Sequence, residues 1–523
     1  MKKIVIPFLL LVTAQIAAAQ EIIYADVQKA DIQKMNFEIL GKIANNYLVY
    51  KELKGKNRIS VYDENMRMLE EVPVNLPKRD NLLDLSFSSG NRHSNLIYQF
   101  QDGNVVYLMA SKAEANGRIL NEPVVLDTTM IAYKTESKIY NTLSSADGNR
   151  VMVFKINRKN RNLYHFTSRL YDNDMTLLNE EHYNLPMEDA SYRLGSYNLT
   201  NEGNLVFTKY SRLKSGNIAE AKLIEKSPGS ADFKFFDLTT IMGMGQLFLD
   251  DIKLKIDEPN QRYILASLYS NTAKGGMDGI YVSAFDKKNG QRLFERTSVF
   301  DDDLRKRAKS SGSLKSVFND YFINNIILNS DGGFTVASEA LYTSGGDTWD
   351  RWGYWGSSLY GPWGGWGGGW GYWSPYRFYS PFFYRSYWWG GWGPWGGVDY
   401  YGNGWSRYHA DNVAIISFDS DGNKTWDNVI VKRQDDTETD GSISYQVLSK
   451  GDNMHFLLNN SGKISSLEDI TISQSGSMRE NEAVNAKDKN IDFMPRYAKQ
   501  VGPGELIVPY RYKNNISFAK VSM

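Results

Sequence analysis

The chain has 523 residues, and its 60 basic residues balance its 60 acidic ones, so the molecule as a whole has no field that would attract nucleic acid or an anionic membrane. It contains no cysteine, which excludes disulfides, thiolate zinc sites and cysteine nucleophiles. A chain of this length without disulfides must be stabilised by its own hydrophobic core, and it is long enough to bury a large one.

The first residues have the three parts of a secretory signal peptide: a basic start at Lys2 and Lys3, an apolar run over residues 4–12, and small residues at Ala17 and Ala19. We expect residues 1–19 to be removed and the mature protein to be exported to the bacterial periplasm, the outer membrane or the cell surface. The alternative is an uncleaved membrane anchor, for which the apolar run is short. No later segment is long and apolar enough to cross a membrane as a helix.

A turn of small polar residues between two apolar runs recurs along the rest of the chain. It is clearest at four places: Leu143–Phe154, Leu199–Phe207, Leu328–Ala337 and Leu448–Met454. Looser versions begin at Leu40, Phe87 and Ile256, and near Lys499. The steps from Phe87 to Leu143, Leu199 and Ile256 are 56, 56 and 57 residues, a regularity that indicates an internal repeat.

The recurring turn predicts a tight β-hairpin, because Gly and Asn tolerate the positive φ that such turns need. A second hairpin follows in several units, marked by an aromatic residue and an aspartate at the end of the third strand: Tyr62-Asp63, Tyr171-Asp172, Phe285-Asp286 and Phe418-Asp419. We expect these aspartates to accept backbone hydrogen bonds within the following turn. Each unit therefore holds four strands in roughly 50 residues.

Such a unit cannot bury both of its faces alone and must stack on its neighbours. Four-stranded units repeated at this period are typical of a β-propeller, in which radial packing leaves only short, protected edges. The aromatic-aspartate ending resembles the strand endings of WD-type and related propeller repeats, although the Gly-His partner of the WD signature is missing. The resemblance concerns architecture, and it implies an all-β fold over most of the mature chain.

The repeats predict a single β-propeller domain over residues 20–523 with seven or eight four-stranded blades. Eight unit starts can be counted, and the last unit has only three strands before the chain ends at Met523. The segment Glu21–Val27 reads as an isolated strand and could supply the missing fourth, so that both ends of the chain close the ring in one blade. Two smaller propellers are the other arrangement that fits the spacing.

Two steps between units are longer than the repeat. The excess between Ile256 and Leu328 falls at Asp301–Phe318, which we expect to form a short polar helix or a linker, with acidic residues at its start as the helix dipole favours. The larger excess is Thr343–Tyr408, between the second and third strands of its unit. It contains 12 of the 13 tryptophans, interleaved with glycines.

This Gly/Trp/Tyr-rich insertion has no periodic apolar face, so we expect a loop without a core of its own. Exposed Trp and Tyr rings stack on sugars, on other aromatic groups and on cations, or lie at membrane interfaces. Its four cations (Arg351, Arg377, Arg385 and Arg407) are too few to favour single-stranded nucleic acid. The competing interpretation is a low-complexity segment that collapses on itself or packs over the ring. The candidate binding residues are Trp352, Trp355, Trp363, Trp366, Trp370, Trp373, Trp388, Trp389, Trp392 and Trp395.

Motifs for catalysis and metal binding are absent from the sequence. The histidines do not fall at metal-ligand spacing, and we expect each to be a surface or hairpin residue: His93, His165, His182, His409 and His455. There is no nucleophile elbow and no phosphate-binding loop. The turn at 419–423 resembles the start of a calcium loop, but its glycine is at the fourth position and Ile430 stands where that loop needs glutamate. We predict no catalytic residue, no metal and no cofactor.

These features favour a non-catalytic binding or scaffold protein of the bacterial cell envelope or surface, whose partner is an envelope protein or a glycan. Contacts would come from the loops of one propeller face and from the Trp-rich insertion. Peripheral contact with a membrane is compatible with the aromatic residues, and nucleic acid is not an expected partner. The first alternative is a secreted hydrolase acting on glycans or peptides, with paired carboxylates near the central channel. The second is a purely structural envelope component.

Overall fold

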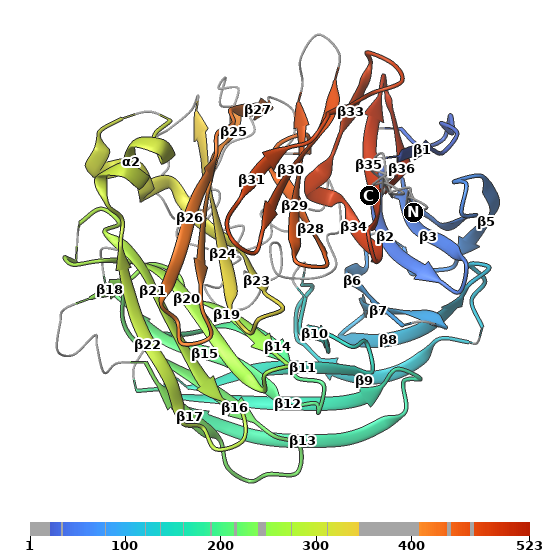
Figure 1. Ribbon diagram of the computed structural model, residues 1–523. Helices are drawn as coiled ribbons and strands as arrows, with labels where there is room; N and C mark the ends of the chain where they lie inside the picture. The colour runs from blue at the N-terminus through green and yellow to red at the C-terminus, as the bar shows by residue number, and fades with distance from the viewer. Residues whose placement is uncertain are drawn as a thin grey trace, which may run out of the picture.

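The strands surround a central axis as eight blades (Figure 1). The protein is seen in a computed structural model that describes residues 21–344 and 407–523, apart from short gaps at 33–34, 79, 91, 121, 136–137, 161, 189–190, 214–216, 239–246, 274, 311, 437–440 and 461–464. In these residues the sheets are antiparallel, and the chain runs from the innermost strand of a blade outwards before it enters the next blade. The all-β propeller expected from the repeats is confirmed, with eight blades.

The first four blades follow one another in simple order. Blade 1 is β2 (Asn36–Ile43), β3 (Asn46–Leu53), β4 (Lys56–Tyr62) and β5 (Met68–Val74), and blade 2 is β6 (Leu82–Ser89), β7 (His93–Asp102), β8 (Val105–Glu114) and β9 (Val124–Met130). Blade 3 is β10 (Tyr140–Ser144), β11 (Arg150–Asn160), β12 (Leu163–Asp172) and β13 (Leu177–Pro186), and blade 4 is β14 (Tyr192–Leu199), β15 (Leu205–Arg212), β16 (Ile218–Lys226) and β17 (Lys234–Asp237).

The later blades carry additions to this plan. Blade 5 is β19 (Lys253–Asp257), β20 (Arg262–Ser270), β21 (Gly279–Asp286) and β22 (Arg292–Val299), and the short β18 (Phe248–Leu249) links it to β16 of blade 4. Blade 6 is β23 (Tyr321–Leu328), β24 (Phe334–Ser344), β25 (Arg407–Phe418) and β26 (Lys424–Ile430), with β27 (Gln434–Asp436) also on β25. Blade 7 is β28 (Tyr445–Lys450), β29 (Asn453–Asn460), β30 (Ser466–Ser473) and β31 (Met478–Glu480), with β32 (Val484–Asn485) also on β30.

Blade 8 is built from both ends of the described chain, and Figure 1 shows these ends together. Its innermost position is shared by β33 (Ile491–Phe493) and β34 (Lys499–Gly502), followed by β35 (Glu505–Tyr512) and β36 (Asn515–Ser522). The outermost strand is β1 (Glu21–Tyr24), which pairs with β36 from Glu21↔Ser522 to Tyr24↔Ala519. β2 lies against β34 on one side and β6 on the other, so the blades form one closed ring and not two smaller propellers.

The hydrophobic core consists of eight clusters among the described residues, and each lies between two neighbouring blades. β3 shows how one strand serves two of them. Tyr47 and Val49 pack towards blade 8, whereas Leu48 and Tyr50 pack towards blade 2. Because alternate side chains of a strand point to opposite faces, every blade is covered on both faces only when its two neighbours are present.

The repeated turns have the predicted geometry. Gly148, Gly203 and Gly332 have φ values of +70°, +96° and +82°, which a residue with a side chain adopts only under strain. The aspartates of the aromatic-aspartate pairs accept backbone hydrogen bonds inside their turns. Asp63 Oδ1 accepts from the backbone N–H of Asn65 and Arg67, and Asp172, Asp286 and Asp419 do the same in their own blades.

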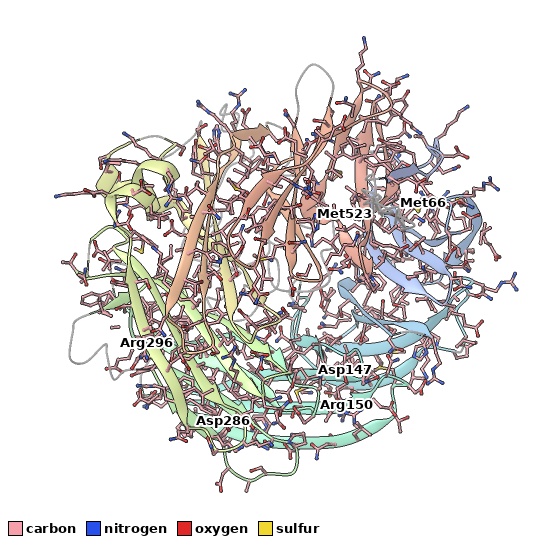
Figure 2. The ribbon with its side chains drawn as sticks, viewed as in Figure 1. Met66, Asp147, Arg150, Asp286, Arg296 and Met523 are labelled. Atoms are coloured by element: carbon pink, nitrogen blue, oxygen red, sulfur yellow. The ribbon has the colours of Figure 1, made fainter. Side chains whose placement is uncertain are left out.

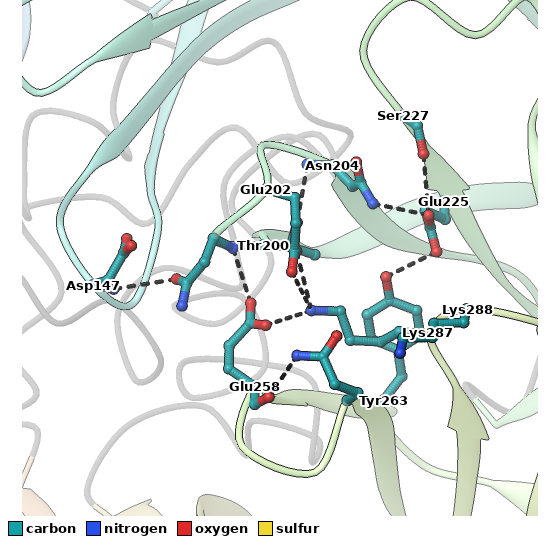
Figure 3. Close-up of polar contacts among 12 residues, drawn as sticks. Asp147, Thr200, Glu202, Asn204, Glu225, Ser227, Glu258, Tyr263, Lys287 and Lys288 are labelled. Carbon is teal, nitrogen blue, oxygen red and sulfur yellow. Dashed lines mark hydrogen bonds and ion pairs between the residues drawn. The ribbon is translucent and has the colours of Figure 1, made fainter.

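One face of the ring carries the turns between the first and second strands and between the third and fourth strands of each blade, and we call it the turn face. We call the opposite face the insertion face. On the turn face, a side chain of one blade binds a backbone carbonyl in the outer turn of the next. The donors and acceptors are Asn46 to Ala115, Asn95 to Asn173, Arg262 to Ser420, Trp426 to Gln474 and Lys520 to Glu64. Figure 3 shows a related network, in which Lys287 binds both Glu202 and Glu258. These contacts tie the blades together at their turns.

The segment between blades 5 and 6 folds as the helix α2 (Asp302–Ala308) and the 3₁₀-helix η1 (Leu314–Asp320). Asp301 caps α2 by accepting from the Leu304 N–H at 2.8 Å, which confirms the predicted helix start. The predicted short polar helix is thus present, but the segment also contributes apolar side chains to the core. Leu304 and Phe318 are buried in the core between blades 5 and 6. No helix in the described part of the chain has the length and apolarity needed to cross a membrane.

Candidate functional site

The insertion is carried by the hairpin of β24 and β25 on the insertion face. The two strands pair from Phe334↔Phe418 to Ser344↔Arg407, so the predicted place between the second and third strands is confirmed. Residues 345–406, which include all ten candidate binding tryptophans, lie outside the described residues. Trp426 is the one tryptophan among the described residues, and it lies on β26 at the turn face.

Four side chains fix the end of this hairpin. The rings of Tyr342 and His409, which are paired across the two strands, stack with their centroids 4.5 Å apart. The hydroxyl of Tyr342 donates to Asp411 Oδ2 at 3.0 Å, and Ser344 Oγ lies 2.7 Å from His409 Nε2. Burial, and then the charge of Asp411, raise the pKa of Tyr342 to about 12, so the phenol stays a donor at neutral pH. Burial lowers the pKa of His409, although Asp411 opposes this.

A buried ion pair lies below these side chains. Glu339 on β24 is fully buried, and its Oε1 lies 2.8 Å from Lys432 Nζ. Its other oxygen accepts from Asn324 Nδ2 of the innermost strand at 2.8 Å and from Ser444 Oγ of blade 7 at 2.6 Å. Lys432 Nζ also donates to the Ala410 carbonyl at 2.7 Å. The carboxylate therefore joins the inner strand of blade 6, the insertion hairpin and the neighbouring blade. We call Tyr342, Ser344, His409, Asp411, Glu339 and Lys432 the hairpin base.

Sequence reasoning did not find the hairpin base. Its residues are scattered single polar side chains, and the contact of Glu339 with Ser444 joins positions 105 residues apart. The one available signal is that Glu339 and Asp411 interrupt apolar strands, where an unpaired carboxylate would be costly. A charged residue inside a strand that is buried on both faces predicts a buried partner, but it does not identify that partner.

All five histidines lie on strands of the blade hairpins, within the expectation of surface or hairpin positions, but two of them are not at the surface. His93 and His409 are buried, with 5% and 8% of their surface exposed. His93 Nε2 lies 2.8 Å from the Asn173 carbonyl of the next blade, so it belongs to the contacts of the turn face. His165 and His182 stack on each other across β12 and β13. His455 lies 3.0 Å from Asp469. Burial follows from the radial packing, which the position of a histidine in a hairpin does not reveal.

No group of three or more histidines and carboxylates among the described residues could hold a metal ion. The calcium-like turn is a hairpin turn, as expected. Both oxygens of Asp419 are used inside it, because Oδ1 accepts from the Asp421 and Asn423 N–H groups and Oδ2 from the Asn423 side chain.

The described first strands of the blades carry four carboxylates, and each has a local partner. Asp257 of blade 5 accepts from Arg262 Nε at 2.7 Å, and Asp492 of blade 8 from Arg511 at 2.5 Å. Asp84 accepts from Gln99 at 3.3 Å. Glu38 lies beside Lys499, whose ammonium donates to the carbonyls of Ile39 and Leu40 at 3.0 Å. The hydrolase hypothesis gains no support from these carboxylates.

Replacing Lys499 with Met is expected to weaken the pH dependence of stability between pH 8 and 10. Burial lowers the pKa of Lys499 to about 8 in the folded protein, although the charge of Glu38 opposes this. Between pH 8 and 10 the Lys499 amine is protonated more in the unfolded chain than in the folded protein. The free energy of unfolding therefore rises with pH, by at most about 1.4 kcal/mol per pH unit. Urea unfolding at several pH values would measure the slope. Lys288→Met, at an exposed turn position, is the control, and equal slopes for both variants would contradict the expectation.

No protein-family model and no curated protein matches this sequence. Among solved structures, the chain is similar to a prolyl endopeptidase (TM-score 0.41, 8% identity, covering 92% of this chain and 55% of that one). It is also similar to prolyl oligopeptidase B of Galerina marginata (TM-score 0.38, 8% identity, 92% and 56%) and to the polysaccharide lyase Uly1 (TM-score 0.39, 9% identity, 86% and 91%). The chain thus spans just over half the length of the two peptidases. Such distant similarities carry no argument about function, and the assignment of the fold as an eight-bladed propeller rests on the chain's own strand pairing and core.

Proposed function

We propose that the protein is a non-catalytic binding or scaffold protein of the bacterial cell envelope, which holds an envelope protein or a glycan with its Trp-rich insertion and the neighbouring loops of the insertion face. The observation that carries this proposal is the hairpin base. β24 and β25 stay paired up to Ser344↔Arg407, and their ends are fixed by the Tyr342–Asp411 and Ser344–His409 contacts.

A rigid base favours recognition because binding residues are typically carried by loops that a stable scaffold positions. The hairpin base fits this pattern, since Glu339 and Lys432 connect the hairpin to the interior of blade 6 and to blade 7. Trp and Tyr rings bury large apolar areas on a partner and lose little side-chain entropy, which suits them to the flat apolar faces of sugars and to protein surfaces. In the sequence these rings are concentrated in the one segment between β24 and β25.

Replacing residues 345–406 with Asn-Gly is expected to abolish binding to isolated envelope fractions and to leave the melting temperature nearly unchanged. A two-residue Asn-Gly turn can close the hairpin directly between Ser344 and Arg407. Cosedimentation of the mature protein with envelope fragments would measure binding. Treating the fragments with protease beforehand separates the two partner classes, because a glycan partner survives this treatment.

A second variant keeps the length of the insertion and changes its ten candidate tryptophans to serine. The proposal expects this variant to lose binding as the shortened one does. If both variants bind as well as the intact protein, the insertion is not the binding element. If no form of the protein binds either preparation, the purely structural alternative replaces the proposal.

A further inference from the structure

We propose that the turn face carries a second binding site, a polar hollow between blades 2, 3 and 4 that takes a small ligand through a carboxylate, phosphate or sulfate group. The hollow has a volume of about 360 Å³. Its walls come from the β6–β7 turn, both turns of blade 3 and the first turn of blade 4, and they include Arg92, Arg150, Asn173 and Asn201. Figure 2 marks Arg150 together with Asp147 of the same turn.

One wall of the hollow is held in place by buried side chains of the neighbouring blade. His93 Nε2 and Asn95 Nδ2 each lie 2.8 Å from the carbonyl of Asn173, and both side chains are buried. Gly90 completes the contact, since a Cβ at this position would lie 2.3 Å from the Asn173 side-chain nitrogen. Any other residue at position 90 would therefore displace Asn173. A binding group fixed in this way loses little entropy when a ligand binds.

Three aspartates line the hollow, and two of them already accept hydrogen bonds within their own turns. Asp147 accepts from Ser145 Oγ at 2.5 Å and from the N–H and side chain of Asn149, and Asp172 accepts from the Thr176 N–H. The aromatic-aspartate turns of other blades use their aspartates as Asp172 is used, so this role is structural. Asp174 faces Arg92 at 3.3 Å and Lys112 at 3.7 Å.

The donors, in contrast, are largely unused. The side chain of Arg150 makes one hydrogen bond within the described part of the chain, from Nη1 to the Asn149 carbonyl, although a guanidinium has five N–H groups. The side-chain N–H groups of Asn173 and Asn201 bind no other described residue. The free groups of the hollow are thus a guanidinium and two amide donors. Such donors suit a ligand with several acceptor oxygens, and a carboxylate or phosphate can accept from a guanidinium in bidentate geometry.

The repeat offers an internal comparison for Arg150. Arg262 occupies the same position in blade 5, because both arginines follow the first turn of their blade and begin the second strand. Arg262 is buried and donates to Asp257 Oδ2 at 2.7 Å. In blade 3 the residue at the position of Asp257 is Ser145, which pairs with Arg150 across the turn. Arg150 therefore has the position of a structural arginine without the buried, hydrogen-bonded carboxylate of Arg262, and it shares the hollow with the carboxylate of Asp147.

The test is calorimetric titration of the mature protein with glucuronate, glucose 6-phosphate, inorganic sulfate and neutral glucose. The proposal expects binding of at least one of the anions and none of glucose, and the three anions distinguish carboxylate, phosphate and sulfate. Arg150→Gln should weaken the binding at least tenfold. Ser145→Asp should also weaken the binding by setting a second carboxylate beside Arg150, although it removes the hydrogen bond from Ser145 Oγ to Asp147.

Arg296→Gln is the matched control. Arg296, labelled in Figure 2, lies on the last strand of blade 5. Its Nη1 donates to the preceding carbonyl at 3.0 Å, as that of Arg150 does. Binding of the anions by this variant should equal that of the unchanged protein. Equal affinities for an anion in the Arg150→Gln variant and the unchanged protein, or no binding of any anion, would overturn the proposal. Neither result depends on the insertion, so the two sites are tested separately.

Discussion

A mature chain that begins at Met35, and so lacks residues 20–34, is expected to lose its cooperative unfolding transition. This segment supplies β1 and then crosses from blade 8 to blade 1. The Ala25 N–H donates to the Phe518 carbonyl at 2.9 Å, and Asp31 forms ion pairs with Lys51 and Arg58 of blade 1. Asp31 and Lys51 are almost completely buried. Removing one partner of a buried ion pair costs about 3–5 kcal/mol, a large part of the roughly 5–15 kcal/mol by which a typical domain is stable.

Circular dichroism during heating would follow the transition, and gel filtration would report association through the newly opened edge of β36. A synthetic peptide of residues 21–32, added to the truncated chain, should restore the transition if the loss is due to this segment alone. Asp26→Asn is the control, since Asp26 is an exposed residue of the same segment. An unchanged melting curve of the truncated chain would show that the ring closes without β1.

Glu339→Leu is expected to destabilise the protein by about 3–5 kcal/mol, because it leaves Lys432 buried without its counterion. Asn324 and Ser444 also lose their acceptor. Burial already lowers the pKa of Lys432, and Glu339 opposes this, so the variant should lower that pKa further. Guanidinium unfolding of the mature protein would measure the change in the free energy of unfolding.

The double variant Glu339→Leu, Lys432→Met should recover most of the loss, since replacing both members of a buried ion pair with apolar residues is often close to neutral. Asp435→Asn provides the control, because Asp435 pairs with Arg407 at the exposed edge of the same blade and such pairs contribute little. If the double variant were as unstable as Glu339→Leu alone, the effect would come from lost packing and not from the uncompensated charge.

The fold could be predicted because its signals are local. Asp63 and Asp419 bind N–H groups no more than four residues away, and Gly148 and Gly332 take positive φ within turns of a few residues. Because these contacts are made between residues that are close in the chain, the same residue types recur at the turns of each unit. All eight predicted unit starts lie in, or at the start of, the first strand of a blade.

Where the repeat is interrupted, prediction was weaker. The first strand of blade 8 begins before Lys499, with β33, and the 3₁₀-helix η2 (Pro495–Tyr497) separates the two pieces. The stretch at Asp301–Phe318 looks polar because its apolar residues are sparse. Phe318 is nevertheless buried, with its ring stacked 3.9 Å from that of Phe300, a partner that precedes the stretch.

The hairpin base could not have been predicted, for a different reason. Ser344 and His409 are neighbours only because the strands on either side of the insertion return to the same register. Glu339 meets Ser444 only because two blades pack face to face. The polar hollow likewise combines turns of three blades. The sequence identified the insertion by its composition, but the residues that support it are defined by distances across the ring.

The pairing of β1 with β36 also sets the order in which the protein can be completed. Tyr24 and Ala519 lie about 495 residues apart in the chain, so their contact is among the least local in the molecule. Synthesis begins at the N-terminus, and β1 has no partner until β36 has left the ribosome. Pairings of such long range form slowly. During this interval, blade 1 exposes the flank that blade 8 later covers, and a growing chain at high concentration is open to association with its neighbours until its last strand arrives.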